Sequence, residues 1–163
     1  MSSIHSIRNV ARQACGVAAG MLLAMLSAIA LWQVFSRYVL NSPSTYTEEL
    51  LRYLMIWMGF LGAAYCFGDG THLSLTLLED SISTRSRFML KLLQSLLVNA
   101  GLVAIMIFGG YRYVVANGAQ LSPTLGISMS WVYLILPLSG VLMVVFGIAH
   151  TASIVDDYRK EAR

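Results

Sequence analysis

Four long stretches without a charged residue dominate this sequence. They cover residues 13–36, 53–68, 92–111 and most of 113–155. An α-helix crosses the hydrocarbon core of a bilayer with about 20 apolar residues, and lipid tolerates only a backbone whose polar groups are satisfied within the segment. The sequence therefore predicts an all-α integral membrane protein with four transmembrane helices.

The expected helices cover about 13–37, 46–68, 84–112 and 129–152. The fourth helix begins late because the segment before it is rich in polar residues, glycine and proline, a composition typical of a loop. Leucines between the second and third helices predict a short element in the membrane interface. No remaining segment is long enough for a soluble domain, so residues 1–163 are expected to form a single four-helix membrane domain.

The basic residues are distributed unevenly among the connections. Eight of the 11 lie beside the termini or before the third helix: Arg8, Arg12, Arg85, Arg87, Lys91, Arg159, Lys160 and Arg163. The first and third connections and their flanks have only Arg37, Arg52 and Arg112. Because cytoplasmic segments carry the excess of Lys and Arg, both termini are expected in the cytoplasm. Membrane topology thus explains the net charge of +3, and no nucleic-acid partner is expected.

The middle of the predicted spans contains no Asp, Glu, Lys or Arg. Transport pathways are normally marked by such residues, which are costly in lipid and persist there for function. Asn99 is the deepest polar residue, and it either bonds a neighbouring helix or contacts a ligand. Cys15 and Cys66 lack the spacing of a metal or redox motif. We therefore expect no catalytic residue, metal ion or other cofactor in this chain.

Charged residues gather at the outer end of the first two helices, on the side with the fewest basic residues. Glu48 lies near the start of the second helix, where a carboxylate favours the helix dipole, and it precedes Arg52 by four residues, the favourable order for a helical pair. Glu49 and Arg37 remain unexplained. They could pair with each other across the connection, or they could face a partner protein.

Two further patterns concern packing and a turn. Gly16 and Gly20, like Gly59 and Ala63, are small residues one helical turn apart, which allows two helices to approach closely. At the end of the second helix, glycines next to Asp69 and His72 predict a tight turn. The Asp and His could bind a metal ion or proton, or could simply form a hydrogen bond that holds the turn.

The outer segment and the turn together carry a family resemblance. Its residues are Arg37-Tyr38, Pro43, Glu48-Glu49-Leu50-x-Arg52-Tyr53, Trp57, Phe60-Leu61-Gly62-Ala63-Ala64 and Gly70-x-His72. In this combination the chain resembles the small membrane subunit of tripartite ATP-independent periplasmic (TRAP) transporters. The resemblance implies a multi-pass protein of the bacterial inner membrane that helps take up organic acids.

The resemblance also implies partners and residue roles. The partners are a large membrane subunit, which moves the substrate with sodium ions, and a periplasmic substrate-binding protein, which the small subunit helps to dock. Three groups of residues follow: Arg37, Glu48, Glu49 and Arg52 for contacts at the periplasmic face; Trp57, Gly59, Phe60, Gly62 and Ala63 for packing in the bundle or against the large subunit; and Asp69, Gly70 and His72 for the cytoplasmic turn. The alternative is a stand-alone proton-coupled exporter, which would require a membrane-embedded carboxylate.

Overall fold

The structure is a computed structural model that describes residues 2–42, 44–68 and 84–161. Four helical spans are long and apolar enough to cross a membrane: Asn9–Tyr38, Thr45–Gly68, Phe88–Ala116 and Met129–Val155. They confirm the predicted all-α membrane fold. The expected interfacial element after the second span, and the turn of Asp69, Gly70 and His72, lie outside the described residues.

The helices extend beyond the predicted bounds. The first two spans are α1 (Ser2–Tyr38) and α2 (Thr45–Gly68). The third is α3 (Thr84–Gly101), a π-helical segment η3 (Leu102–Gly109) and α4 (Gly110–Ala116). The fourth is α5 (Met129–Tyr133) followed by α6 (Ile135–Glu161). The expected start of the first helix at 13 and end of the fourth at 152 differ from the structure, because the apolar run ends at the membrane whereas a helix can continue into water.

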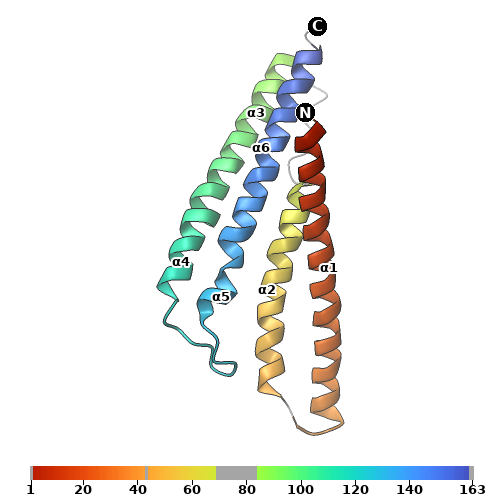
Figure 1. Ribbon diagram of the computed structural model, residues 1–163, viewed down its shortest axis with the longest axis vertical. Coiled ribbons are helices and arrows are strands. Elements are labelled where there is room, and N and C mark those ends of the chain that lie inside the picture. The colour runs from red at the N-terminus through yellow and green to blue at the C-terminus, as the bar shows by residue number, and fades with distance from the viewer. Residues whose placement is uncertain (1, 43, 69–83, 162–163) are drawn as a thin grey trace.

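The helices form a row rather than a closed bundle. α1 packs against α2 and also contacts α6, α2 packs against α6, and α6 packs against α3 and η3 (Figure 1). Both termini lie at one end of the row, and the connections after α1 and α4 lie at the other (Figure 1). We call the latter the loop end; it contains residues 39–44, of which 43 is not described, and 117–128.

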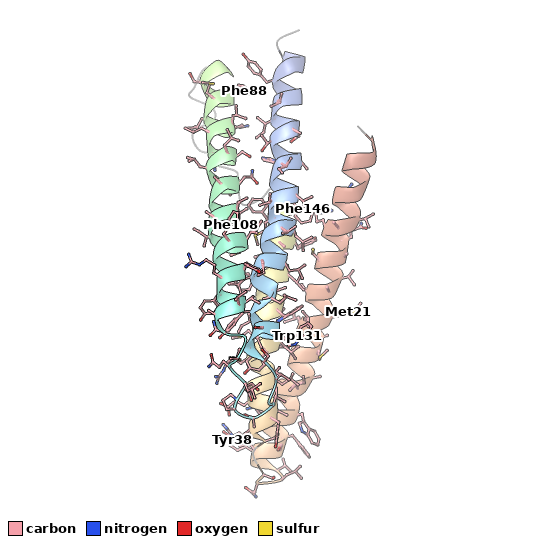
Figure 2. All side chains as sticks on the ribbon, turned by 60° about the vertical axis from the view of Figure 1, so that its left-hand side comes forward. Met21, Tyr38, Phe88, Phe108, Trp131 and Phe146 are labelled. Atoms are coloured by element: carbon pink, nitrogen blue, oxygen red, sulfur yellow. The ribbon has the colours of Figure 1, made fainter. Side chains whose placement is uncertain are left out.

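α6 provides the core of the row. In the most apolar stretch of the fourth span, which consists largely of α6, 39% of the residues are buried within the chain. The corresponding values for the first three spans are 6%, 11% and 6%. Phe146 and Ile135 of α6 are almost fully buried, and Figure 2 places Phe146 among the helices. Met21 and Phe108 are exposed, at 65% and 64%. Most of the apolar surface of the first three spans is therefore left for lipid or another protein.

Glycines bring the third and fourth spans together. A Cβ on Gly110 would lie 3.0 Å from the Leu136 Cβ and 3.1 Å from the Pro137 ring, and one on Gly140 would lie 2.7 Å from the Met106 Cβ. The contact at Gly140 is closer than real Cβ atoms come, so that position requires glycine, and at Gly110 an added Cβ would force its neighbours to shift. The absence of side chains at these two positions lets the backbones of the two spans approach each other there.

The helix of the fourth span is interrupted at Leu134, three residues before Pro137. Proline has no N–H, so it cannot donate to the carbonyl of Tyr133, four residues earlier. The backbone N–H of Leu134 bonds the Ser130 carbonyl at 2.9 Å, and the N–H of Leu138 bonds the Leu134 carbonyl at 3.3 Å. The short α5 before this break is capped by Ser128, whose side chain accepts a hydrogen bond from the Ser130 N–H.

Polar side chains meet between α3 and α6. The hydroxyls of Ser95 and Thr151 lie 2.6 Å apart, and Thr151 also donates to the Gly147 carbonyl. Asn99 donates from Nδ2 to the Ser95 carbonyl of its own helix, at 2.8 Å. Its Oδ1 is buried without a hydrogen-bond partner. The structure therefore does not give Asn99 the conventional hydrogen bond to a neighbouring helix that we expected.

Candidate functional site

One carboxylate links the two halves of the chain at the loop end. Glu49 of α2 is buried, with 8% of its surface exposed, whereas its neighbour Glu48 is exposed. Its Oε2 accepts hydrogen bonds from the backbone N–H groups of Thr124, at 2.9 Å, and Leu125, at 3.1 Å. Those residues lie 75 and 76 positions further along the chain, between the third and fourth spans.

The second oxygen of Glu49 is also occupied. Tyr53, one turn along α2, donates from its hydroxyl to Oε1 at 2.5 Å. The same hydroxyl lies 3.4 Å from the Met129 sulfur at the start of α5. An ionised carboxylate only accepts hydrogen bonds, so two amides and a phenol suit it well. Glu49 and Tyr53 together hold the loop and the start of α5 against α2.

The loop that Glu49 holds is folded on itself. The N–H of Ser122 bonds the Ile127 carbonyl at 2.8 Å, and the N–H of Gly126 bonds the Ser122 carbonyl at 3.2 Å. Gly126 has a φ of +66°, a conformation that glycine adopts without steric cost. This tight turn directs the N–H groups of Thr124 and Leu125 toward Glu49.

Further bonds anchor the two ends of the loop. The Ser128 hydroxyl donates to the Gly118 carbonyl at 2.9 Å, and the Ser130 hydroxyl donates to the Val114 carbonyl at 2.7 Å. The rings of Tyr113 and Tyr133 meet edge to face, with centroids 4.7 Å apart. The loop is thus an ordered platform that is fixed to α2, α4 and α5.

The surface around this platform is apolar and aromatic. Large exposed side chains at the loop end are Tyr38, Val39, Leu40, Tyr46, Leu121, Ile127 and Trp131. Figure 2 shows Tyr38 and Trp131 on the outside of the ribbon at this end. Such residues suit either the membrane interface or the surface of a partner protein.

The structure separates the four charged residues predicted for this face. Glu49 is directed inward and bonds the loop, so neither of its expected roles, a pair with Arg37 or contact with a partner, applies. Arg37, Glu48 and Arg52 are exposed. In the described part of the chain, Glu48 and Arg52 form no ion pair with each other, contrary to the pair expected from their spacing. These three side chains remain available to a partner.

The residues predicted for packing also differ among themselves. Trp57, Phe60 and Ala63 are half-buried. For Gly59 and Gly62, however, nothing within the chain lies within 4 Å of where a Cβ would stand. In the first span, Gly16 packs on the Tyr65 ring, whereas Gly20 faces open space.

Sequence reasoning missed the partners of Glu49. The segment around Thr124 and Leu125 was expected only to be a loop, and backbone N–H groups leave no mark in composition. The proline and glycine of Ser-Pro-Thr-Leu-Gly do signal a tight turn, a shape that can present such groups to an anion. That turn was the available clue to an acidic side chain nearby.

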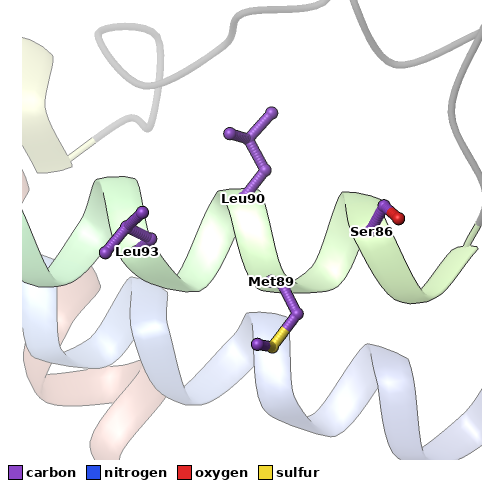
Figure 3. Close-up of a pocket in the computed structure, with 4 residues that line it drawn as sticks. All are labelled: Ser86, Met89, Leu90 and Leu93. Atoms are coloured by element: carbon purple, nitrogen blue, oxygen red, sulfur yellow. The ribbon is translucent and has the colours of Figure 1, made fainter.

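No other described feature offers a site for chemistry. No three His, Cys, Asp or Glu side chains among the described residues come close enough to hold a metal ion. An open pocket on α3 is lined by Ser86, Met89, Leu90 and Leu93, without a titratable side chain (Figure 3). The loop end is therefore the candidate functional site, as a surface for contact.

Residues 26–157 match the model of the family described as tripartite ATP-independent periplasmic transporters, DctQ component. The chain belongs to this family. It is 32% identical over 148 residues to the sialic acid TRAP transporter small permease protein SiaQ of Vibrio cholerae, covering 83% of this chain and 85% of that one. It is 27% identical to a putative TRAP transporter small permease protein of Haemophilus influenzae, with 86% of each chain covered.

A third relative of this DctQ-family chain is a longer protein. Over 126 residues it is 28% identical to the sialic acid TRAP transporter permease protein SiaT of Haemophilus influenzae. The match covers 76% of this chain and only 20% of SiaT. Family membership and the four spans together establish a multi-pass inner-membrane protein and a TRAP small permease.

Proposed function

We propose that this chain is the non-catalytic small subunit of a sodium-coupled TRAP transporter for organic acids. It scaffolds the large transport subunit and helps to dock the periplasmic substrate-binding protein. The observation that carries the proposal is the platform fixed by Glu49. A carboxylate bonded by two backbone amides and a phenol serves to hold a surface in place, and that surface lies at the end opposite the termini.

The lack of charged side chains in the middle of the described spans favours a scaffolding role over a transport role. In the described spans, the polar side chains between α3 and α6 are Ser95, Asn99 and Thr151. Each forms a hydrogen bond to another of them or to the backbone, and only the Asn99 Oδ1 is left without a partner. A route for a carboxylate and sodium ions would need polar groups left available along it. Substrate and sodium ions are therefore assigned to the large subunit.

SiaT supports the assignment of that partner. The part of SiaT similar to this chain occupies one-fifth of a single permease polypeptide. The other four-fifths of SiaT belong to the same polypeptide, so in SiaT the two parts are covalently joined. For the present chain, the corresponding partner is a separate large membrane subunit.

The sidedness of the proposal follows from the charge distribution. The excess of basic residues beside the termini and before the third span favours the cytoplasm for that side, so in our proposal the loop end faces the periplasm. There the platform and the exposed Arg37, Glu48 and Arg52 can meet the substrate-binding protein.

One observation, the burial of Glu49, favours the alternative that this chain is an exporter. An exporter carboxylate must exchange protons and cargo, whereas both oxygens of Glu49 are bonded within the chain. Membership of a transporter small-subunit family also favours the subunit.

Reconstitution separates the two functions. Liposomes that contain this chain alone are compared with liposomes that contain this chain and the large subunit, with the binding protein outside. We expect organic-acid uptake driven by a sodium gradient only in the second set. Proton-coupled efflux from the first set would favour the exporter and contradict the proposal.

A further inference from the structure

One side of α2 is open along almost its whole length. Six residues spaced alternately four and three apart line this side, which we call the α2 seam: Glu48, Arg52, Met55, Gly59, Gly62 and Cys66. All except the half-buried Gly62 are exposed, and nothing stands within 4 Å of a Cβ built on either glycine.

Residues on other sides of α2 make contacts within the chain. Tyr65 packs on Gly16 of α1, where an added Cβ would lie 2.9 Å from the ring. Glu49 and Tyr53 bind the loop and α5, and Ala64 is completely buried. The seam is therefore the side on which α2 can take another neighbour.

The geometry of the α2 seam fits a single long helix. Alternating spacings of three and four residues bring side chains into line when two helices cross at about 20°. The 18 residue-to-residue steps from Glu48 to Cys66 rise about 27 Å, close to the roughly 30 Å of the hydrocarbon core. A peripheral loop could not cover this length, whereas a transmembrane helix does.

A second open stripe of the same spacing provides a contrast. The α6 seam follows α5 and α6 and consists of Trp131, Leu134, Leu138, Val141, Val145 and Ile148, all exposed. It holds no charge and no glycine, as suits a surface in contact with acyl chains. Protein contacts within membranes favour small residues and polar groups instead. Composition thus distinguishes the two seams.

Charge at the outer end of the α2 seam indicates the chemistry of its neighbour. Arg52 and Glu48 form no ion pair within the described residues, although they stand one turn apart. The adjacent carboxylate, Glu49, is already committed to the loop. A neighbouring helix that presents an acidic side chain opposite Arg52 would satisfy the guanidinium, which aliphatic lipid chains cannot do.

We infer that the α2 seam is the surface on which the large permease subunit docks, through one transmembrane helix with an acidic residue near its outer end. The α6 seam faces lipid. This inference rests on the proposed function, and SiaT supports it because its polypeptide joins a segment similar to this chain to a larger permease segment.

Photo-crosslinking tests the assignment directly. A photoreactive amino acid replaces Met55 of the α2 seam or, as the matched control, Val141 of the α6 seam; their exposures are 57% and 47%. Each variant is co-expressed with the large permease subunit of its own transporter. We expect at least about ten times more chain-to-subunit adduct from position 55 than from position 141. Equal yields, or a larger yield from 141, would overturn the inference.

Substitutions supply an independent test by co-purification of the large subunit. Gly59→Leu fills open space in the isolated chain, so membrane insertion should persist while recovery of the large subunit falls roughly tenfold. The control is Ala152→Leu, at the next exposed position of the α6 seam. Unchanged recovery with Gly59→Leu, or an equal loss with Ala152→Leu, contradicts the inference.

The charge at the outer end is tested in the same way. Arg52→Gln should lower recovery and Arg52→Lys should restore part of it, whereas Arg112→Gln, an exposed arginine on α4, should not change it. Equal recovery with all three variants rejects the acidic partner residue. If the unmodified chain does not co-purify with the large subunit, the proposed function itself fails. If the two co-purify but the crosslinked adduct forms from position 141, only the assignment of the α2 seam fails.

Discussion

The side-chain oxygen of Asn99 occupies the space that a Cβ would take on Gly147. A Cβ built there would collide with the Asn99 amide, and the Asn99 Oδ1 has no conventional hydrogen-bond partner. The Asn99 amide therefore lies directly beside the Cα of Gly147, an approach that is possible only because glycine has no side chain. This close contact holds Asn99 between α3 and α6.

Replacement of Gly147 by alanine should separate α3 from α6. The added methyl group displaces the Asn99 amide, and overpacking of this kind costs about 1–3 kcal/mol of unfolding free energy. Thermal unfolding of the purified chain in detergent measures the effect. Gly20→Ala is the matched control, since nothing lies within 4 Å of its Cβ and alanine favours a helix. A second substitution, Asn99→Ala, should restore part of the loss; if it does not, the collision is not its cause.

Glu49→Gln should loosen the outer loop and lower uptake while membrane insertion persists. The amide is neutral and keeps only one acceptor oxygen, so the bonds from the two backbone N–H groups lose their charge assistance and Tyr53 loses the second oxygen to which it donates. Hydrogen exchange at Thr124 and Leu125 should accelerate on the order of tenfold. Glu48→Gln, one position earlier and exposed, should change neither exchange nor loop order. Slow exchange retained in Glu49→Gln would show that Glu49 does not hold the loop in place.

Gly126 allows a test of the loop that leaves Glu49 intact. Its φ of +66° is accessible to asparagine but costs a β-branched residue about 1–2 kcal/mol. No atom lies within 4 Å of the position that a Cβ would take there, so an added Cβ meets no steric clash. Gly126→Val should reduce affinity for the substrate-binding protein, measured by titration in nanodiscs with the large subunit, and Gly126→Asn should not. Equal affinities in the two variants would show that the shape of the loop does not matter for docking.

Arg37→Ala should also lower uptake without affecting insertion. Arg37 is exposed at the end of α1, where its charge can attract the substrate-binding protein. The defect should therefore be largest at low ionic strength and shrink as salt screens the attraction. A rate of association that is unchanged at low salt would exclude Arg37 from docking.

Sidedness can be measured with a membrane-impermeant thiol reagent. In a background without Cys15 and Cys66, a cysteine replaces either Ala119 in the outer loop or Asn9 near the start of α1, both exposed. Intact spheroplasts should be labelled at position 119, and position 9 should react only after permeabilisation. The reverse pattern would invert the topology deduced from the basic residues.

Much of the fold follows from the sequence because lipid imposes simple requirements. Uncharged runs predicted all four spans. The true extent of α1 was hidden because Arg12 ends the apolar run but does not end a helix. The π-helical turn of Leu102–Gly109 was also hidden, since its apolar residues suit an α-helix equally well.

The site was only half predictable. A charged cluster at the outer end of the second helix was evident, but the role of Glu49 depends on backbone N–H groups 75 residues away. Pairing rules within a helix favoured Glu48 with Arg52, and they consider only neighbours along one helix. Glu49 lies on the inner side of α2 because the loop folds against it, and no pattern within the second helix encodes that contact.

A row of four helices exposes a large surface for its mass. Most side chains of the first three spans lie outside the core of the chain, so the acyl chains of the host bilayer contribute directly to the tilt of the helices. The row is therefore held most firmly when another protein covers one of its broad sides. A change in bilayer thickness would reach the outer platform through α2, because Glu49 fixes that platform to the same helix.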